Sequence, residues 1–183
     1  LGMEHYYTIS VLNSIGEAVR GMGLNSDRIE EYKKTILESI AVEKTAENLI
    51  SSGADNDAIA AYRRAVHKES LFIGKYHISI ADLHGKIAKV LKYIGRYDGA
   101  IVFYRYILAI NLKSLGMDHM NTEYAYEDLV NVATLKGMKK EDATGYGQNA
   151  KLSIEHEDNG DEAMKNKNFE VAINQYKKAI EIE

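Results

Sequence analysis

Small and apolar residues recur along this chain at fixed distances from a series of glycines. Four glycines, at positions 23, 53, 95 and 137, act as anchors, and Lys167 occupies the fifth anchor position. The residue seven positions before each anchor is glycine, alanine or valine, and the residue four positions before it is apolar. Because residues three, four and seven positions apart share one face of an α-helix, this pattern predicts a helix ending at each anchor.

A second periodic segment follows each anchor. Tyrosine recurs nine positions after four of the anchors, at Tyr32, Tyr62, Tyr104 and Tyr176. Alanine recurs five positions after three of them, at Ala58, Ala100 and Ala172. The fourth unit fits after one inserted residue, which puts Ala143 in the alanine position and Gly147 in the tyrosine position. Small residues let antiparallel helices approach closely, and the tyrosine fills the space beside them. Each unit is therefore predicted to be a helical hairpin whose turn is the anchor, because glycine adopts the helix-ending conformation that other residues resist.

The pattern divides the chain into five hairpins within one domain. Their approximate limits are 6–38, 39–70, 78–113, 121–152 and 153–183. Residues 28–52 contain neither proline nor glycine, so either the turn between the first two hairpins is compressed or their helices merge. The same two alternatives apply to residues 148–159. The chain begins without methionine at the first letter of a repeated motif, so we expect a fragment of a longer array.

A short motif precedes three of the hairpins. It reads "LGMEHYYT" at residues 1–8, "LGMDHMNT" at residues 115–122 and, more loosely, "IGKYHISI" at residues 73–80. Its histidines, His5, His77 and His119, are repeat-equivalent, so stacking would keep them about one repeat apart instead of bringing them to one metal ion. We expect each histidine, with the acid that precedes it in two copies, to cap the next helix.

The second helices resemble those of the tetratricopeptide repeat (TPR), most closely in "GRYDGAIVFYRYIL" (95–108) and "NFEVAINQYKKAIEI" (168–182). The distance is 42 residues from Ala58 to Ala100 and 43 residues from Ala100 to Ala143, and the extra residues of the second interval carry "LGMDH". This combination is similar to the kinesin light chain version of the family. The resemblance implies an all-α fold, a right-handed superhelix (solenoid) of about five TPR-like hairpins, and a role in protein binding.

Composition and motifs exclude several classes of function. The net charge of −4 gives no basic field for nucleic acid, and no apolar run approaches the ~20 residues that insertion into a membrane requires. Cysteine is absent, and neither H-E-x-x-H nor G-x-S-x-G occurs. The glycine pair Gly145 and Gly147 follows no predicted strand, so it does not predict a phosphate loop. We therefore expect no catalytic residue, no metal and no cofactor, and an intracellular protein of the cytoplasm or an organelle.

The first helix of each hairpin should line the concave face of such an array, where solenoids bind extended partners. The candidate groove residues are Asn13, Arg20, Asp82, Lys86, Lys89, Lys92, Tyr93, Tyr124, Glu127 and Asn131. The three lysines predict a basic stripe, and Glu157 and Asp161 predict an acidic end.

Kinesin light chains bind acidic, aromatic-bearing cargo peptides in a basic groove, so the resemblance favours a groove for an acidic segment. The predicted function is a non-catalytic adaptor or scaffold that binds a peptide or partner subunit. One alternative is a structural subunit of a larger complex that contacts neighbours through its convex face or open ends. A second is that the groove residues are only a solvated surface.

Overall fold

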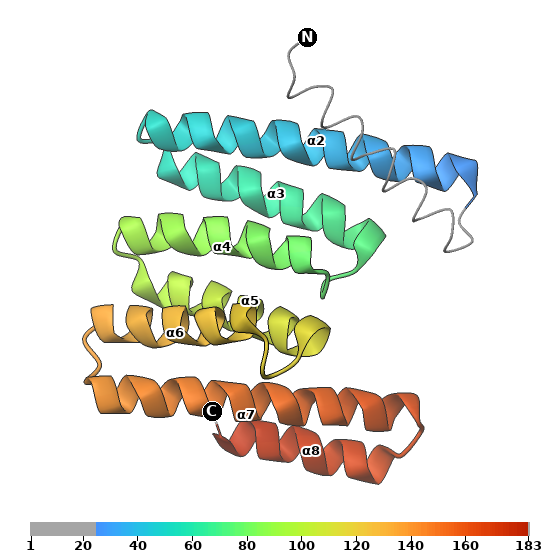
Figure 1. The fold of residues 1–183 in the computed structure, drawn as a ribbon, viewed down its shortest axis with the longest axis vertical. Helices are drawn as coiled ribbons and strands as arrows, with labels where there is room; N and C mark the ends of the chain where they lie inside the picture. Colours follow the sequence, from blue (N-terminus) through green and yellow to red (C-terminus); the bar gives the residue numbers. More distant parts are fainter. Residues whose placement is uncertain (1–24, 183) are drawn as a thin grey trace. The chain divides into compact units, whose positions relative to one another are not determined.

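The computed structural model describes residues 25–182, apart from the side chain of Phe72, and within them all regular structure is α-helical. Seven helices and no strands are present in this part of the chain, which confirms the all-α class. The chain divides into two compact units, Leu1–Phe72 and Ile73–Glu183. Figure 1 shows the helices in chain order, coloured from blue to red.

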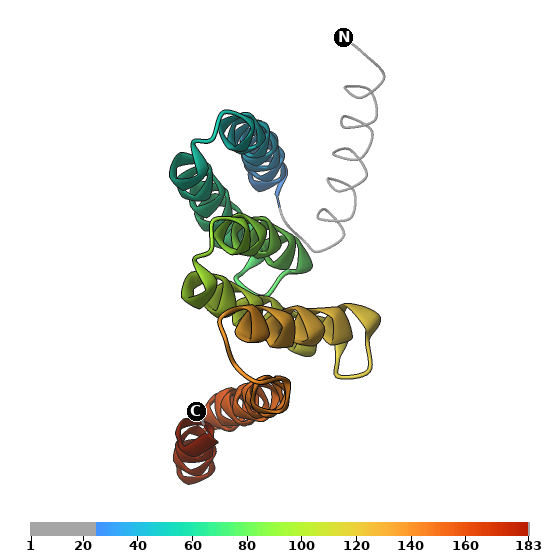
Figure 2. The same cartoon turned by 90° about the vertical axis from the view of Figure 1, so that its left-hand side faces the viewer.

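Unit 1 contains a hairpin of two long helices, α2 (Ser26–Ser51) and α3 (Asp55–Ile73), which lie side by side (Figures 1 and 2). Asn25 caps α2 by accepting a hydrogen bond from the Arg28 amide at 3.0 Å. Helix α2 runs unbroken through residues 28–51, so the first two predicted hairpins share one helix and the predicted limit at residues 38 and 39 lies inside it. The physical reason is the absence of a helix-breaking residue in this segment.

Unit 2 contains five helices, each packed against the next along the chain. They are α4 (Ile78–Tyr93), α5 (Tyr97–Leu115), α6 (Met120–Leu135), α7 (Lys140–Lys165) and α8 (Phe169–Ile182). Helices α4, α6 and α7 lie on one side of this unit, and α5 and α8 lie on the other (Figure 2). Helix α7 passes through residues 148–159 without a break, so the predicted limit at residues 152 and 153 also lies within a merged helix.

The predicted turns form at four of the five anchors. Gly53, Gly95, Gly137 and Lys167 all have positive φ angles, of 78°, 74°, 112° and 59°. In each turn the amide that follows the anchor donates back to a carbonyl five residues earlier, as expected for a Schellman helix end. These bonds join Ala54 to Leu49, Arg96 to Leu91, Met138 to Ala133 and Asn168 to Ala163, at 2.8, 2.8, 3.2 and 2.8 Å. Gly23 lies outside the described residues.

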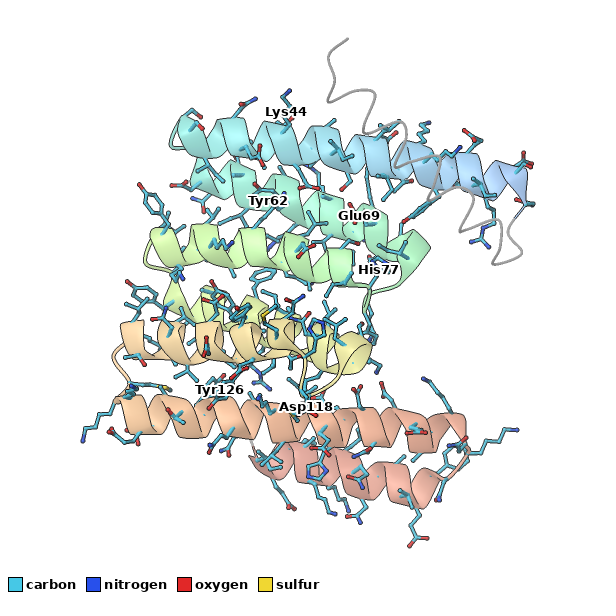
Figure 3. All side chains as sticks on the ribbon, in the orientation of Figure 1. Lys44, Tyr62, Glu69, His77, Asp118 and Tyr126 are labelled. Atoms are coloured by element: carbon cyan, nitrogen blue, oxygen red, sulfur yellow. The ribbon has the colours of Figure 1, made fainter. Side chains whose placement is uncertain are left out.

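Two of the repeated histidines cap helices, as the sequence predicted. The Nδ1 atom of His77 accepts a hydrogen bond from the Ser79 amide at 3.2 Å, and that of His119 accepts one from the Asn121 amide at 3.1 Å. Figure 3 shows His77 at the start of α4. The repeated motif therefore has a structural role, as a helix cap, in its copies at residues 73–80 and 115–122. His5 lies outside the described part of the chain.

Two glycines inside α7 make room for tyrosines of neighbouring helices. A Cβ atom on Gly160 would lie 2.5 Å from Cε1 of Tyr176 in α8. A Cβ atom on Gly147 would lie 2.7 Å from Cε2 of Tyr126 and 2.8 Å from Cγ2 of Val130, both in α6. Figure 3 shows Tyr126 between α6 and α7. The glycine pair at 145 and 147 therefore belongs to a helix, and Gly147 sets how closely α6 approaches.

Substituting Gly147 tests whether the close contact with α6 outweighs the gain in helix propensity that replacing a glycine brings. Gly147→Ala forces its new methyl group against Val130, a stiff β-branched side chain, and we expect a net loss of about 1–2 kcal/mol of unfolding free energy. The control is Gly145→Ala in the same helix, where a Cβ atom meets nothing within 4 Å. It should raise the unfolding free energy by up to about 1 kcal/mol. Urea unfolding followed by circular dichroism compares the two, and a stability gain in both would contradict the close approach.

Lys167 is the one non-glycine residue with positive φ in the described chain, so its turn should be strained. A left-handed conformation costs an L-residue with a Cβ atom about 1–2 kcal/mol. Lys167→Gly should therefore raise the unfolding free energy by about 1 kcal/mol, after allowance for the greater freedom of glycine in the unfolded chain. Lys165→Gly, two residues earlier and at the last residue of α7, is the control and should lower it by up to about 1 kcal/mol. Equal effects of the two substitutions in thermal unfolding would disprove the strain.

Candidate protein-binding surface

Four of the predicted groove residues form one row on the solvent side of α4. At about 100° per residue, Asp82, Lys86, Lys89 and Tyr93 fall within a narrow sector of the helix. The opposite sector is buried, and Tyr93 is 82% exposed. Lys86 is half-buried, whereas Lys89 and Asp82 are exposed. The row therefore presents positive charge and an aromatic ring to solvent.

Lys92 departs from the predicted stripe. Residues three apart drift by about 60° around a helix, so the third lysine lies on the flank of α4 and not in the outer row. Its Nζ atom is 3.9 Å from Oδ1 of Asp128 in α6, and 5.8 Å from the ring centre of Tyr104 in α5. A partly exposed ion pair of this kind stabilises by less than about 1 kcal/mol. It nevertheless shows that the flank of α4 meets α6 and that Lys92 already has a partner.

The tyrosine beneath this ion pair is a buried part of the scaffold. Tyr104 is 2% exposed. Burial, followed by the negative charge of Asp128, raises the pKa of Tyr104 to about 12, so its phenol stays neutral at physiological pH. Tyr104 thus supports the contact between α4, α5 and α6 without adding charge to the surface.

Helix α6 presents a second exposed row that contains the other described groove residues. Tyr124, Glu127 and Asn131 are all exposed, and they lie opposite the buried side of the helix. The same row includes two exposed apolar side chains, Met120 and Leu135. Sequence reasoning did not include Met120 among the binding residues because it treated that residue as part of the connector.

We call these two rows together the α4–α6 face. It consists of Asp82, Lys86, Lys89 and Tyr93 from α4 and of Met120, Tyr124, Glu127, Asn131 and Leu135 from α6. Figure 2 shows α4 and α6 on the same side of α5. The α4 row carries an excess of positive charge, whereas Glu127 in the α6 row is acidic, so charge changes sign from one helix to the next. Asn13 and Arg20 lie outside the described residues.

One of the two acids of the predicted acidic end on α7, Asp161, lies beside a lysine from α5. The Nζ atom of Lys113 lies 2.5 Å from Oδ1 of Asp158 and 3.7 Å from Oδ2 of Asp161. Asp161 also accepts a hydrogen bond from the Tyr176 hydroxyl at 2.8 Å. Burial lowers the pKa of Lys113, but the hydrogen bond and charge of Asp158 outweigh it and the pKa is raised. The sequence did not predict a role for Lys113, because this residue lies on α5, the second helix of its hairpin, and only first helices were expected to line the groove.

These residues also line a depression in the surface of unit 2. The cavity has a volume of about 370 Å³, and its lining residues are Lys113, Asp158, Asp161, Glu162, Lys165 and Asn166. Acidic groups outnumber basic ones here, and two of the three carboxylates already contact Lys113. The depression therefore offers less net charge than the acids alone suggest.

Within residues 25–182, no group of three or more histidine or acidic residues is arranged to hold a metal ion. In the same part of the chain, no helix is long and apolar enough to cross a membrane. Compared with known proteins, the sequence matches no family model and no curated protein.

His84 lies on the side of α4 that faces α5, away from the α4–α6 face. Its ring centre is 5.3 Å from that of Phe103 and 5.3 Å from that of Tyr106. Burial lowers the pKa of His84 from 6.5 to about 4, because the charged imidazolium is poorly solvated between these rings. The residue is thus a neutral packing element and not part of the binding surface.

The low pKa of His84 predicts a pH dependence of stability. Between pH 6.5 and about 4 the unfolded chain protonates this histidine whereas the native chain does not, so unfolding becomes easier as pH falls through this window. His84→Phe keeps an aromatic ring and removes the titration. Denaturant unfolding across the window should show a steeper loss of stability for the parent chain than for His84→Phe, since carboxylates contribute equally to both. Parallel curves would contradict the buried neutral state.

Proposed function

We propose that this chain is a non-catalytic protein-interaction module, an adaptor or scaffold that acts inside the cell and binds a segment of a partner protein on the α4–α6 face. The observation that carries the proposal is that α4 exposes Lys89 and Tyr93 and α6 exposes Tyr124, and that these two helices lie on the same side of unit 2 (Figure 2). We further propose that the hairpins belong to a right-handed TPR-like solenoid. The Schellman turns and the contacts between small residues and tyrosine support that assignment.

The two rows suit an extended peptide with an acidic part and an aromatic or aliphatic side chain. Lys86 and Lys89 attract carboxylates and increase the association rate. Tyr93 and Tyr124 offer large, amphipathic contact surfaces at a low cost in side-chain entropy. Asn131 can donate to and accept from the peptide backbone, since its amide carries both kinds of group. Glu127 disfavours an acidic residue above α6, so the acidic part of the peptide should lie over α4.

A second candidate function is supported by a different part of unit 2. Helix α8 exposes several large apolar side chains, which is typical of a surface that contacts another protein. This favours the alternative of a subunit in a larger complex, and it does not conflict with peptide binding on the α4–α6 face.

Charge reversal at Lys89 tests the proposed peptide surface. Display of random short peptides should first enrich acidic sequences that contain an aromatic residue. Lys89→Glu should then weaken the best peptide by about tenfold or more, equivalent to at least about 1.4 kcal/mol, because it replaces attraction by repulsion. Tyr93→Ala should weaken it as well. Fluorescence anisotropy measures both dissociation constants.

The matched control is Lys178→Glu, which makes the same charge change at an exposed position on α8 and should leave binding unchanged. Lys92 is left intact, because Lys92→Glu would place a carboxylate beside Asp128 and disturb the contact between α4 and α6. If Lys89→Glu retains the parent affinity with unchanged helical circular dichroism, or if the library yields no acidic preference, the proposed surface is wrong.

A further inference from the structure

Helix α7 contains the one place in the sequence where glycine directly follows asparagine, at Asn159 and Gly160. Asparagine is a chemically labile residue, and it is most reactive before glycine, which has no side chain to hinder attack on the asparagine amide. Asn159 is exposed, whereas Gly160 is buried. A reactive pair thus lies inside the helix that two hairpins share.

The reaction open to this pair is deamidation through a cyclic imide. The main-chain nitrogen of Gly160 bonds to Cγ of Asn159 and loses its proton, and the side-chain nitrogen of Asn159 leaves as ammonia. Water then opens the succinimide ring. Cleavage between the nitrogen and Cγ leaves an aspartate, whereas cleavage between the nitrogen and the main-chain carbonyl carbon leaves an isoaspartate, whose main chain runs through Cβ and Cγ.

The helical conformation prevents the first step. Inside an α-helix ψ is about −42°, and each interior amide donates a hydrogen bond to the carbonyl one turn earlier. Both features keep the Gly160 nitrogen away from Cγ of Asn159. The attack therefore requires α7 to open locally, and its rate follows the fraction of chains that are open at this point.

The residues on either side of the pair are held by two other helices. Asp158 lies 2.5 Å from Nζ of Lys113 in α5. Asp161 lies 3.7 Å from the same nitrogen and accepts a hydrogen bond from the Tyr176 hydroxyl of α8 at 2.8 Å. The ring of Tyr176 also packs against Gly160. Opening α7 at this point thus breaks contacts with both α5 and α8, and Figure 1 shows α8 beside α7.

We propose that Asn159 is a site of spontaneous deamidation, that the contacts of Lys113 and Tyr176 with α7 keep it unreactive in the folded chain, and that conversion to isoaspartate interrupts α7. Isoaspartate adds a carbon atom to the main chain, so the helical hydrogen bonds that span it lose their register. A chain that has opened and reacted here can no longer rebuild the continuous helix. The inference goes beyond the proposed binding function and does not depend on it.

The first experiment compares rates of conversion at neutral pH by peptide mapping with mass spectrometry. A synthetic peptide of residues 155–163 supplies the rate without tertiary contacts. We expect Asn159 in the folded full chain to react at least about tenfold more slowly than in the peptide, because only the open fraction reacts.

Two variants test the contacts that hold α7 closed. Lys113→Ala removes the ion pair, and Tyr176→Phe removes the hydroxyl while keeping the ring against Gly160. Each should raise the rate in the folded chain about two- to tenfold. The matched control is Lys68→Ala, which removes an ion pair of the same 2.5 Å length in unit 1 and should leave the rate unchanged.

The second experiment tests the effect on α7. The parent chain is incubated in urea and refolded, and the isoaspartate form is separated and identified by its reaction with isoaspartyl methyltransferase. We expect weaker helical circular dichroism and a lower Tm for this form. Asn159→Asp keeps the normal main chain and should match the parent, and Asn159→Gln should yield no isoaspartate at position 159, because its longer side chain does not form the five-membered ring.

Three outcomes would overturn the proposal. One is equal rates in the peptide and in the folded parent chain, which would mean that folding does not protect Asn159. Another is that Lys113→Ala and Tyr176→Phe react no faster than Lys68→Ala, which would exclude protection by these contacts. The last is an isoaspartate form with the Tm and the circular dichroism of the parent chain, which would mean that α7 tolerates the added carbon.

Discussion

The packing of unit 2 depends on the close contact between a small residue on one helix and a tyrosine on the next. Gly160 and Tyr176 show it most directly, because no side chain larger than glycine fits at position 160 without displacing the ring. This contact exists only if the turn between the helices has the right length and direction. The positive φ of the anchor residue supplies that direction, so turn geometry and helix packing are one requirement.

The sequence predicted the features that follow from local rules. The anchors and the histidine caps follow from residue types at fixed spacings, and the structure confirms them at Gly53, Gly95, Gly137, His77 and His119. One predicted contact of a tyrosine with a small residue is confirmed where Tyr176 packs against Gly160. The merged helices were left open, because the absence of a breaker between residues 28 and 52 permits a continuous helix without requiring one. Packing against neighbouring helices decides whether such a segment stays one helix, and the residue pattern of a single sequence does not predict that packing.

The candidate site was less predictable for the same reason. A spacing of three suggested that Lys86, Lys89 and Lys92 act together, but the third lysine rotates away and pairs with Asp128. Likewise, Lys113 lies 3.7 Å from Asp161, one of the two residues that the sequence predicted to form an acidic end. Both differences concern contacts between helices, where a few tens of degrees of rotation decide which charge meets which. Charge patterns along one helix therefore predict a surface less well than turn signals predict a turn.

Helix α7 belongs to two hairpins at once, and this has a mechanical consequence. Its 26 residues form a rod of about 39 Å that packs with α6 along one part and with α8 along another. Arrays with a loop between every pair of helices can bend or unfold one repeat at a time. A shared helix leaves no loop between the two hairpins, so a tilt of α6 would be passed to α8 as a tilt of the same rod. A partner that binds one end of α7 would thereby change the orientation of the helix packed against its other end.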